Sequence, residues 1–186
     1  MLVTLAISIP AFYGQMMAAH LEGDNEVIIG LAGAINLILG GFGGVVFGYF
    51  IDRTKQYKAI SVGLILSMTV LFVLYTFLLP FGSVPLDVVL VASLGFVMMS
   101  LWSTGQNFGG ELIYPEKESL YVLVLTCVGM VGSAGFMAAA QEIMDMENKE
   151  LLSGAQLVGI MFSVVTLCSL PFYALVKVKM NRTDQI

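Results

Sequence analysis

Residues 27–51 read VIIGLAGAINLILGGFGGVVFGYFI, and the seven residues that follow read DRTKQYK. The first stretch contains no charged side chain. A helix needs about 20 consecutive apolar residues to cross the hydrocarbon core of a bilayer. The stretch meets that length, and the charges after it mark the point where the chain leaves the membrane. The sequence therefore predicts a transmembrane helix followed by a charged loop at residues 52–58.

The composition extends this interpretation to the whole chain. Of the 186 residues, 58% are hydrophobic and only 11% are charged, and the mean hydropathy is +0.92. A soluble domain is nearer half apolar and a quarter charged. With so few charges a soluble fold of this size could not cover its surface, whereas a lipid-facing fold has no such need. We therefore expect an all-α membrane protein.

Five further segments have a similar length and apolarity. With the first, the predicted spans cover residues 2–19, 27–51, 59–79, 86–112, 119–143 and 152–178. The connections between them are short, so none of them can hold a soluble domain. The predicted architecture is one bundle of six transmembrane helices over residues 1–180, with a cytoplasmic tail at residues 181–186.

The basic side chains are divided unevenly between the two ends of these spans. Counting connections from the N-terminus, seven basic residues lie in the second and fourth connections and within the last ten residues of the chain: Arg53, Lys55, Lys58, Lys117, Lys177, Lys179 and Arg182. The first, third and fifth connections contain only Lys149. Because Lys and Arg are enriched in cytoplasmic loops, we expect the second and fourth connections and both termini to be cytoplasmic.

A loop motif lies at the end of the second span. Its residues are Gly48, Asp52, Arg53, Lys55 and Lys58. This arrangement resembles the gating loop of the major facilitator superfamily, G-x-x-x-D-R/K-x-G-x-R/K-R/K. The aspartate would pair with a basic group or cap a helix of a partner segment, and breaking that contact would permit another conformation. We expect Thr54 to replace the second glycine of the motif. An ordinary basic cytoplasmic loop is the alternative.

The same span contains a face of small residues. Gly40, Gly44 and Gly48 are four residues apart, so they lie along one side of a helix. Small residues at this spacing let membrane helices approach closely. We therefore expect this face to contact another helix, which by itself does not indicate transport.

A second motif closes the fourth span with the characteristic residues Glu111, Tyr114, Pro115 and Glu116. Together with the loop motif, it resembles the family of the feline leukaemia virus subgroup C receptors, solute carrier family 49, within the major facilitator superfamily. The resemblance covers nearly the whole chain, aligned to the second half of a twelve-helix carrier. It implies alternating-access transport of a small organic solute, namely choline, ethanolamine or haem. It also implies a missing N-terminal half as the partner, and the plasma membrane as the location.

The resemblance further implies a substrate site. Tyr13 is similar to a family tyrosine that contacts the quaternary ammonium group of choline, and we assign it to substrate binding together with Gln15 and Gln106. The alternatives are a packing role for the tyrosine and helix–helix hydrogen bonds for the amides. The family's eleventh helix also offers a glutamine to choline, and residues 127–131 contain none. The site therefore departs from the family pattern at this position.

The sequence has few residues of the kinds that form catalytic sites, metal sites or disulfides. The one histidine, His20, lies at the end of a predicted span, and Cys127 and Cys168 lie inside apolar stretches. Because this arrangement offers no catalytic dyad, metal motif or disulfide framework, we expect no enzyme activity, no cofactor and no nucleic-acid partner. The expected partners are the lipid bilayer and a small-molecule substrate. A membrane protein that does not transport, such as a receptor, an assembly factor or a truncated paralogue, is the alternative.

Overall fold

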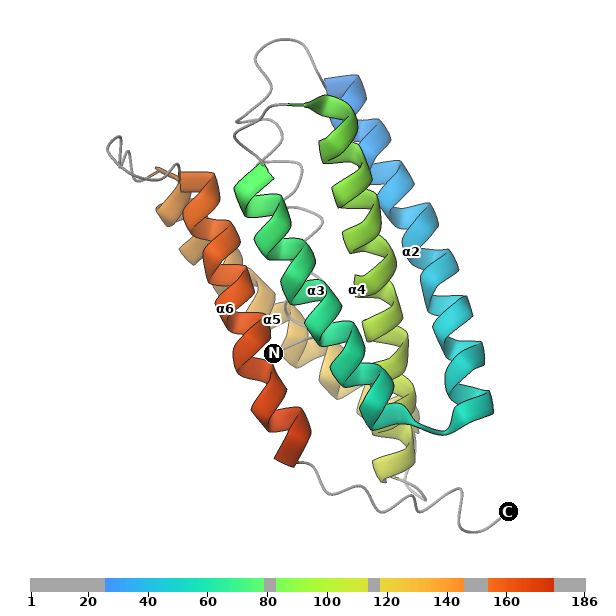
Figure 1. Ribbon diagram of the computed structural model, residues 1–186. Coiled ribbons are helices and arrows are strands. Elements are labelled where there is room, and N and C mark those ends of the chain that lie inside the picture. The colour runs from blue at the N-terminus through green and yellow to red at the C-terminus, as the bar shows by residue number, and fades with distance from the viewer. Residues whose placement is uncertain (1–25, 79–82, 114–117, 146–153, 176–186) are drawn as a thin grey trace.

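The structure is a computed structural model that describes residues 26–78, 83–113, 118–145 and 154–175. Over these residues the chain forms five α-helices and no strand (Figure 1). They are α2 (Glu26–Thr54), α3 (Tyr57–Leu78), α4 (Val84–Ile113), α5 (Glu118–Asp145) and α6 (Gly154–Leu175). Helices are therefore confirmed at the positions of the last five predicted spans, to within a few residues at each end. The first predicted span, residues 2–19, lies outside the described residues, so a sixth helix stays a prediction.

The helices form because apolar residues fill almost their whole length. Four of the five, α2 to α5, are long and apolar enough to cross a membrane, whereas α6 contributes a shorter apolar stretch at Gln156–Pro171. Pro171 lies in the last part of α6, and because proline has no N–H it leaves the carbonyl four residues earlier without its helical hydrogen bond. The described residues thus have the element lengths that a bilayer requires.

The helices lie side by side in one bundle, with α3 and α4 in the middle (Figure 1). The most extensive contact joins α2 to α4, and α3 packs on both α6 and α4. Contacts of α5 with α4 and α6 are much smaller. The largest fully buried side chains come from four helices: Ile51, Ile65, Met68, Tyr75, Leu94, Met98 and Phe162. The core therefore lies where α3 meets α4 and α6.

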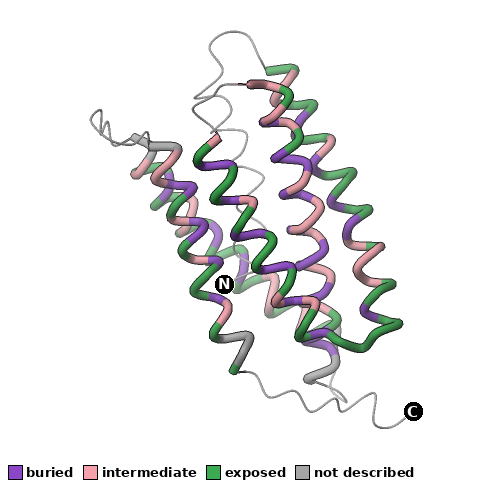
Figure 2. Tube along the Cα trace, viewed as in Figure 1, coloured by how far each residue is buried: buried purple, intermediate pink, exposed green. Residues whose placement is uncertain are grey.

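The outer surface is apolar. Among the described residues, Val27 of α2 is 81% exposed and Val131 of α5 is 76% exposed. In Figure 2, α2 is mostly exposed or half-buried, whereas buried positions recur along α3 and α4. Such a surface would be unfavourable in water, but it is what hydrocarbon chains of lipid require.

Several polar side chains inside the bundle donate hydrogen bonds to backbone carbonyl groups. Asn36 of α2 is buried and donates its Nδ2–H to the carbonyl oxygen of Val91 on α4, at 2.6 Å. Thr69, Ser100 and Thr126 instead donate their hydroxyl groups to the carbonyl four residues earlier in the same helix. The Asn36 side chain therefore joins α2 to α4 by a hydrogen bond between helices.

The predicted charged loop at residues 52–58 is shorter than expected. Helix α2 continues through Thr54, and α3 begins at Tyr57. Asp52 and Arg53 therefore lie on the last turn of α2, and Lys58 lies on the first turn of α3. The prediction was wrong in extent because charged side chains at a helix end can reach solvent without a loop. A basic residue in the last turn also stabilises the helix dipole.

Candidate functional site

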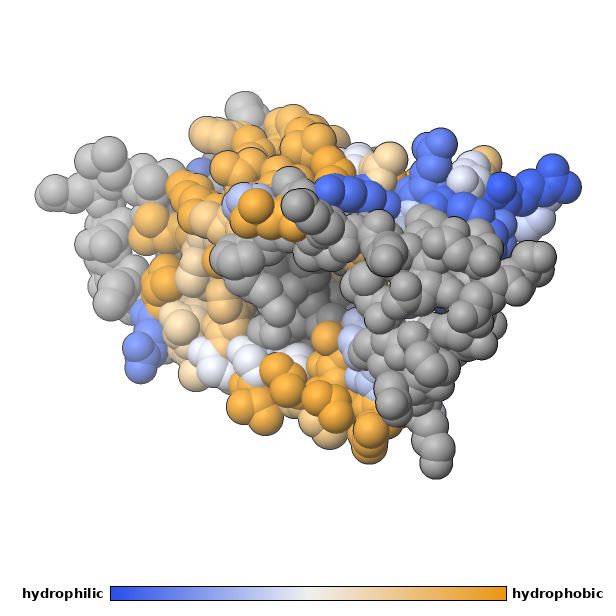
Figure 3. Space-filling model, turned by 90° about the horizontal axis from the view of Figure 1, so that it is seen from below, coloured by the Kyte–Doolittle hydropathy of each residue, from blue (hydrophilic) through white to orange (hydrophobic). Residues whose placement is uncertain are grey.

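The tight turn between α2 and α3 holds the gating-motif residues. Asp52, Arg53, Lys55 and Lys58 are all exposed there, and Gly48 lies one turn earlier on α2. Viewed from this end, the molecule shows hydrophilic side chains gathered mainly at one side, with hydrophobic side chains along the flanks (Figure 3). The structure therefore brings the predicted gate residues together in one polar group.

Lys55 has the backbone conformation that the motif reserves for glycine. Its φ is +54°, and its N–H donates to the carbonyl oxygen of Ile51 at 2.8 Å. This is the left-handed helix cap in which glycine is most common. Thr54 is still helical, and its hydroxyl donates to the carbonyl oxygen of Phe50. The assignment of Thr54 to the second glycine was therefore wrong by one residue: Lys55, seven positions after Gly48, occupies that place.

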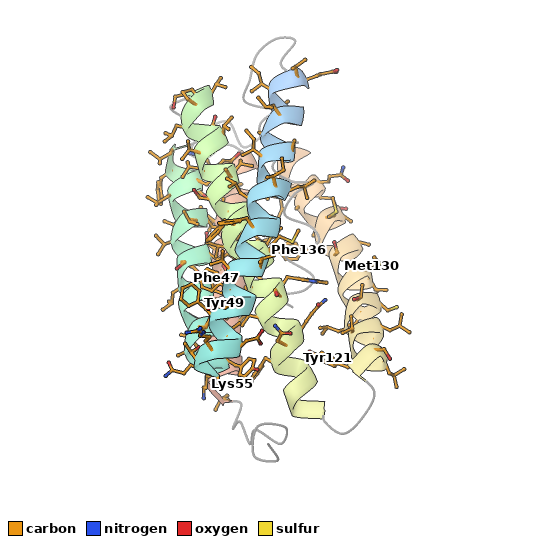
Figure 4. All side chains as sticks on the ribbon, turned by 90° about the vertical axis from the view of Figure 1, so that its right-hand side faces the viewer. Phe47, Tyr49, Lys55, Tyr121, Met130 and Phe136 are labelled. Atoms are coloured by element: carbon orange, nitrogen blue, oxygen red, sulfur yellow. The ribbon has the colours of Figure 1, made fainter. Side chains whose placement is uncertain are left out.

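The charged groups of this turn differ in their partners. The guanidinium carbon of Arg53 lies 5.4 Å from the centre of the Tyr49 ring, a cation–π contact one turn along α2. Asp52 forms no salt bridge with any residue that the structure describes. Figure 4 shows Tyr49 and Lys55 at the same end of α2. The Asp52 carboxylate is thus exposed and available to a group outside the described part of the chain.

A small apolar cluster fixes the turn to the bundle. Ile51 of α2, Tyr57 of α3 and Phe108 of α4 are buried together, with Ile60 packed against them. The Tyr57 and Phe108 rings have centroids 6.2 Å apart. Because all three helices contribute, the end of α2 that carries Asp52 and Arg53 is fixed to both α3 and α4.

The glycine face of α2 contacts α4, as predicted, but the crowding varies along it. A Cβ added at Gly40 would lie 2.7 Å from Met99 Cγ, whereas at Gly48 it would lie 3.8 Å from Ser103 Oγ, an ordinary contact. The closest approach is at Gly43, where a Cβ would lie 2.5 Å from the backbone oxygen of Phe96. Gly43 was missed because only glycines four residues apart were considered in the sequence. Residues three apart, such as Gly40 and Gly43, also lie on the same face of a helix.

The predicted substrate residues are only partly described. Gln106 is half-buried on α4, whereas Tyr13 and Gln15 lie outside the described residues. Of the second motif, Glu111 lies within α4, but its side chain is outside the described part, as are Tyr114, Pro115 and Glu116. In residues 127–131, where the family glutamine is absent, Gly129 is buried and the other four residues are exposed.

Helices α4 and α5 meet at one close contact. The phenol of Tyr121 lies directly against Gly109, so that no side chain could be accommodated there without movement. In Figure 4, Tyr121 lies on the side of α5 that is turned toward α4. Further along, the Phe136 ring of α5 packs edge-on against Phe162 of α6, with centroids 5.0 Å apart. Within the described residues, no group of three or more His, Cys, Asp or Glu side chains could hold a metal ion.

Comparison with known proteins gives these features a context. No protein family model matches the chain. The human choline/ethanolamine transporter FLVCR2 is 29% identical over 151 residues, which cover 78% of this chain and 28% of that protein. The choline/ethanolamine transporter FLVCR1 of Felis catus is 31% identical over 124 residues, which cover 63% of this chain and 22% of that protein. An uncharacterized MFS-type transporter of Caenorhabditis elegans is 27% identical over 122 residues, which cover 62% of this chain and 21% of that protein.

These similarities confirm the resemblance drawn from the two motifs. The match covers most of this chain, but it spans about a third or less of the length of the curated relatives. The apolar helices and the transporter relatives agree on a membrane protein. The chain is therefore an integral membrane protein homologous to the FLVCR1 and FLVCR2 transporters and to an MFS-type transporter.

Proposed function

We propose that the chain is one six-helix bundle of a carrier that moves choline or ethanolamine across the plasma membrane by alternating access. The observation that carries the proposal is the similarity to two transporters whose names specify choline/ethanolamine. Haem, the other substrate implied by the motif resemblance, has no support in these names. In such carriers one bundle rocks against a second around a site near the midplane.

The surface of the bundle supports a role beside a second bundle. Helices α2 and α5 expose large apolar side chains on most of their turns, and they are the least buried of the four membrane-length helices that the structure describes. We propose that part of this surface packs on an N-terminal bundle and the remainder faces lipid. The substrate would then lie between the two bundles, contacted by Tyr13, Gln15 and Gln106.

Asp52 is the proposed gate residue on the cytoplasmic side. It is exposed at a turn that is fixed to α4 by the cluster of Ile51, Tyr57 and Phe108. A carboxylate in this position can pair with a basic group or a helix N-terminus of the second bundle in one conformation only. The carrier would have no catalytic step and would need no cofactor.

Uptake of radiolabelled choline and ethanolamine tests this function. The assay compares cells that express the protein with cells that express Asp52→Asn, at matched amounts of protein in the membrane. We expect the wild type to accumulate substrate and Asp52→Asn to lower the initial rate at least about fivefold, the lower end of typical coupling energies. Glu142→Gln, an exposed carboxylate near the other end of the bundle, is the matched control and should leave the rate unchanged.

Two results would contradict parts of the proposal. Membrane insertion without uptake of either substrate would favour the alternative of a membrane protein that does not transport. Equal uptake by the wild type and Asp52→Asn would remove Asp52 from the gate while leaving transport intact.

A further inference from the structure

An exposed apolar stripe runs along α2 and ends at a basic side chain. Ile38, Phe42, Val45 and Tyr49 are three or four residues apart, so they lie on one side of the helix. These four residues, which we call the outer stripe, are 58–73% exposed. Arg53 follows one turn after Tyr49 on the same side. Neither the proposed substrate site nor the proposed role of Asp52 uses this stripe.

The outer stripe faces away from the rest of the described bundle. The opposite side of α2 carries Gly40 and Gly43, which meet Met99 and Phe96 of α4. In Figure 1, α2 forms one edge of the bundle, and no helix that the structure describes lies beyond it. The stripe is therefore open to whatever surrounds this edge of the molecule.

A contact between Arg53 and Tyr49 holds a positive charge at the end of the stripe. The guanidinium carbon lies 5.4 Å from the centre of the tyrosine ring, and tyrosine is enriched where membrane helices meet the lipid headgroups. Lys55 and Lys58 are exposed in the same turn. Among the side chains that the structure describes at this end, Asp52 is the one carboxylate. The turn therefore has a net positive charge.

This charge distinguishes between the two surroundings proposed for the bundle surface. With the predicted orientation, a second bundle would present basic loops of its own at the same end, because Lys and Arg are enriched in cytoplasmic loops. Two basic surfaces repel each other. Anionic phospholipids of the cytoplasmic leaflet instead attract basic side chains that lie beside a membrane helix. The outer stripe and its basic end therefore complement a lipid and not a second bundle.

A phospholipid combines the two chemistries of this surface. From Ile38 to Tyr49 the stripe is about 16 Å long, roughly half of the hydrocarbon thickness and thus the depth of one leaflet. Its apolar side chains suit acyl chains. At its end, a phosphate can accept two hydrogen bonds from one guanidinium group. The length, the apolar surface and the charge therefore all agree with one lipid molecule.

The stripe leaves Asp52 to the proposed gate. With 3.6 residues per turn, Arg53 lies about 40° from Tyr49 around the helix in one direction, and Asp52 lies about 60° from it in the other. The lipid contact and the gate contact therefore occupy neighbouring sides of the same turn.

We propose that the outer stripe and the α2–α3 turn bind one anionic phospholipid, whose phosphate contacts Arg53 and Lys55 and whose acyl chains lie along Ile38, Phe42 and Val45. Lys58 adds positive charge beside the headgroup. This binding is independent of which solute the carrier moves. It assigns the outer side of α2 to lipid and leaves the exposed side of α5 for the second bundle.

Native mass spectrometry of the purified full chain in a neutral detergent tests the site. Dioleoyl phosphatidylglycerol and dioleoyl phosphatidylcholine, which have the same acyl chains and differ in headgroup charge, are added separately at increasing concentrations. Inorganic phosphate is added in a third series, because it lacks the chains that the stripe would hold. The variants are Arg53→Gln alone, Arg53→Gln with Lys55→Gln, and Tyr49→Leu. Lys149→Gln, four residues after the end of α5, is the control with the same change in charge.

We expect the wild type to bind phosphatidylglycerol at least about fivefold more tightly than phosphatidylcholine, and to retain no inorganic phosphate. Arg53→Gln should weaken phosphatidylglycerol binding roughly fivefold and the double variant roughly 30-fold, which correspond to the usual attraction of one and two basic residues to an anionic membrane surface. Tyr49→Leu keeps the stripe apolar but removes the ring beside Arg53, so it should weaken binding less. Lys149→Gln should bind as the wild type does.

Several results would overturn the proposal. Equal binding of the two lipids by the wild type would exclude a site for an anionic headgroup. Equal losses for Arg53→Gln and Lys149→Gln would mean that only the net charge of the chain matters. A dimer that Arg53→Gln disrupts would assign the outer stripe to a second copy of the chain. Because phosphatidylcholine binding is recorded for every variant, a loss confined to phosphatidylglycerol is distinguished from misfolding.

Discussion

Lys55 ends α2 in the left-handed conformation, with a φ of +54°. An L-residue with a Cβ pays roughly 1–2 kcal/mol in this region, and glycine does not. Glycine loses more backbone freedom on folding, however, and this entropy cost cancels about 0.5–1 kcal/mol of the gain from removing the Cβ. We therefore expect Lys55→Gly to raise the stability by about 1 kcal/mol, measured by thermal unfolding in detergent. Thr54→Gly, one residue earlier and still helical, should instead lower it by up to about 1 kcal/mol; the reverse order would contradict the left-handed cap at Lys55.

Asn36 makes the hydrogen bond that joins α2 to α4 through a side chain. Its Nδ2–H donates to the Val91 carbonyl oxygen at 2.6 Å in a buried setting. Interhelical hydrogen bonds in membranes contribute about 0.6 kcal/mol on average and about 1.7 at most, so Asn36→Ala should lower the stability by that amount. Ser93→Ala is the control, because its hydroxyl donates to Val89 within the same helix. Equal losses of stability for the two variants would mean that the hydrogen bond between helices contributes no more than one within a helix.

At the scale of an element, α2 and α4 pack closely because the glycines of α2 have no side chain to separate the two helices. A Cβ at Gly43 would lie 2.5 Å from the Phe96 backbone oxygen, and a backbone cannot move aside as a flexible side chain can. We expect Gly43→Ala to destabilise the bundle by about 1–3 kcal/mol, the usual cost of overpacking. Gly41→Ala is the matched control on the same helix, since nothing lies within 4 Å of the added Cβ. It should be neutral or stabilising, because alanine favours helix by up to about 1 kcal/mol; similar effects at both positions would argue against this packing.

The sequence predicted these helices well and their faces poorly, for one physical reason. A run of apolar residues long enough for the bilayer specifies a helix whatever it contacts. The predicted ends of α2 to α6 therefore lie within a few residues of the observed ends. The same apolarity on all sides removes the contrast between core and surface that marks faces in soluble helices. The row of Gly40, Gly44 and Gly48 stood out by its spacing. Gly43 did not, because its role depends on which helix lies opposite.

At the scale of the whole molecule, charge is separated between the two ends of the bundle. Arg53, Lys55 and Lys58 are exposed at the end that holds the α2–α3 turn. At the other end the described residues include the exposed carboxylates of Glu26 and Glu142. Because basic residues near the ends of membrane spans are retained in the cytoplasm, this separation predicts that the α2–α3 turn faces the cytoplasm.

Cysteine labelling can test this orientation at two connections. In a background of Cys127→Ser and Cys168→Ser, which removes the two exposed thiols, Gln56→Cys is placed in the α2–α3 turn and Ser83→Cys immediately before α4. We expect a membrane-impermeant maleimide to label Ser83→Cys in intact cells and Gln56→Cys only after permeabilisation. The opposite pattern would reverse the orientation. It would move Asp52 to the outer side of the membrane and separate the proposed gate from the cytoplasm, although the helices would stay as they are.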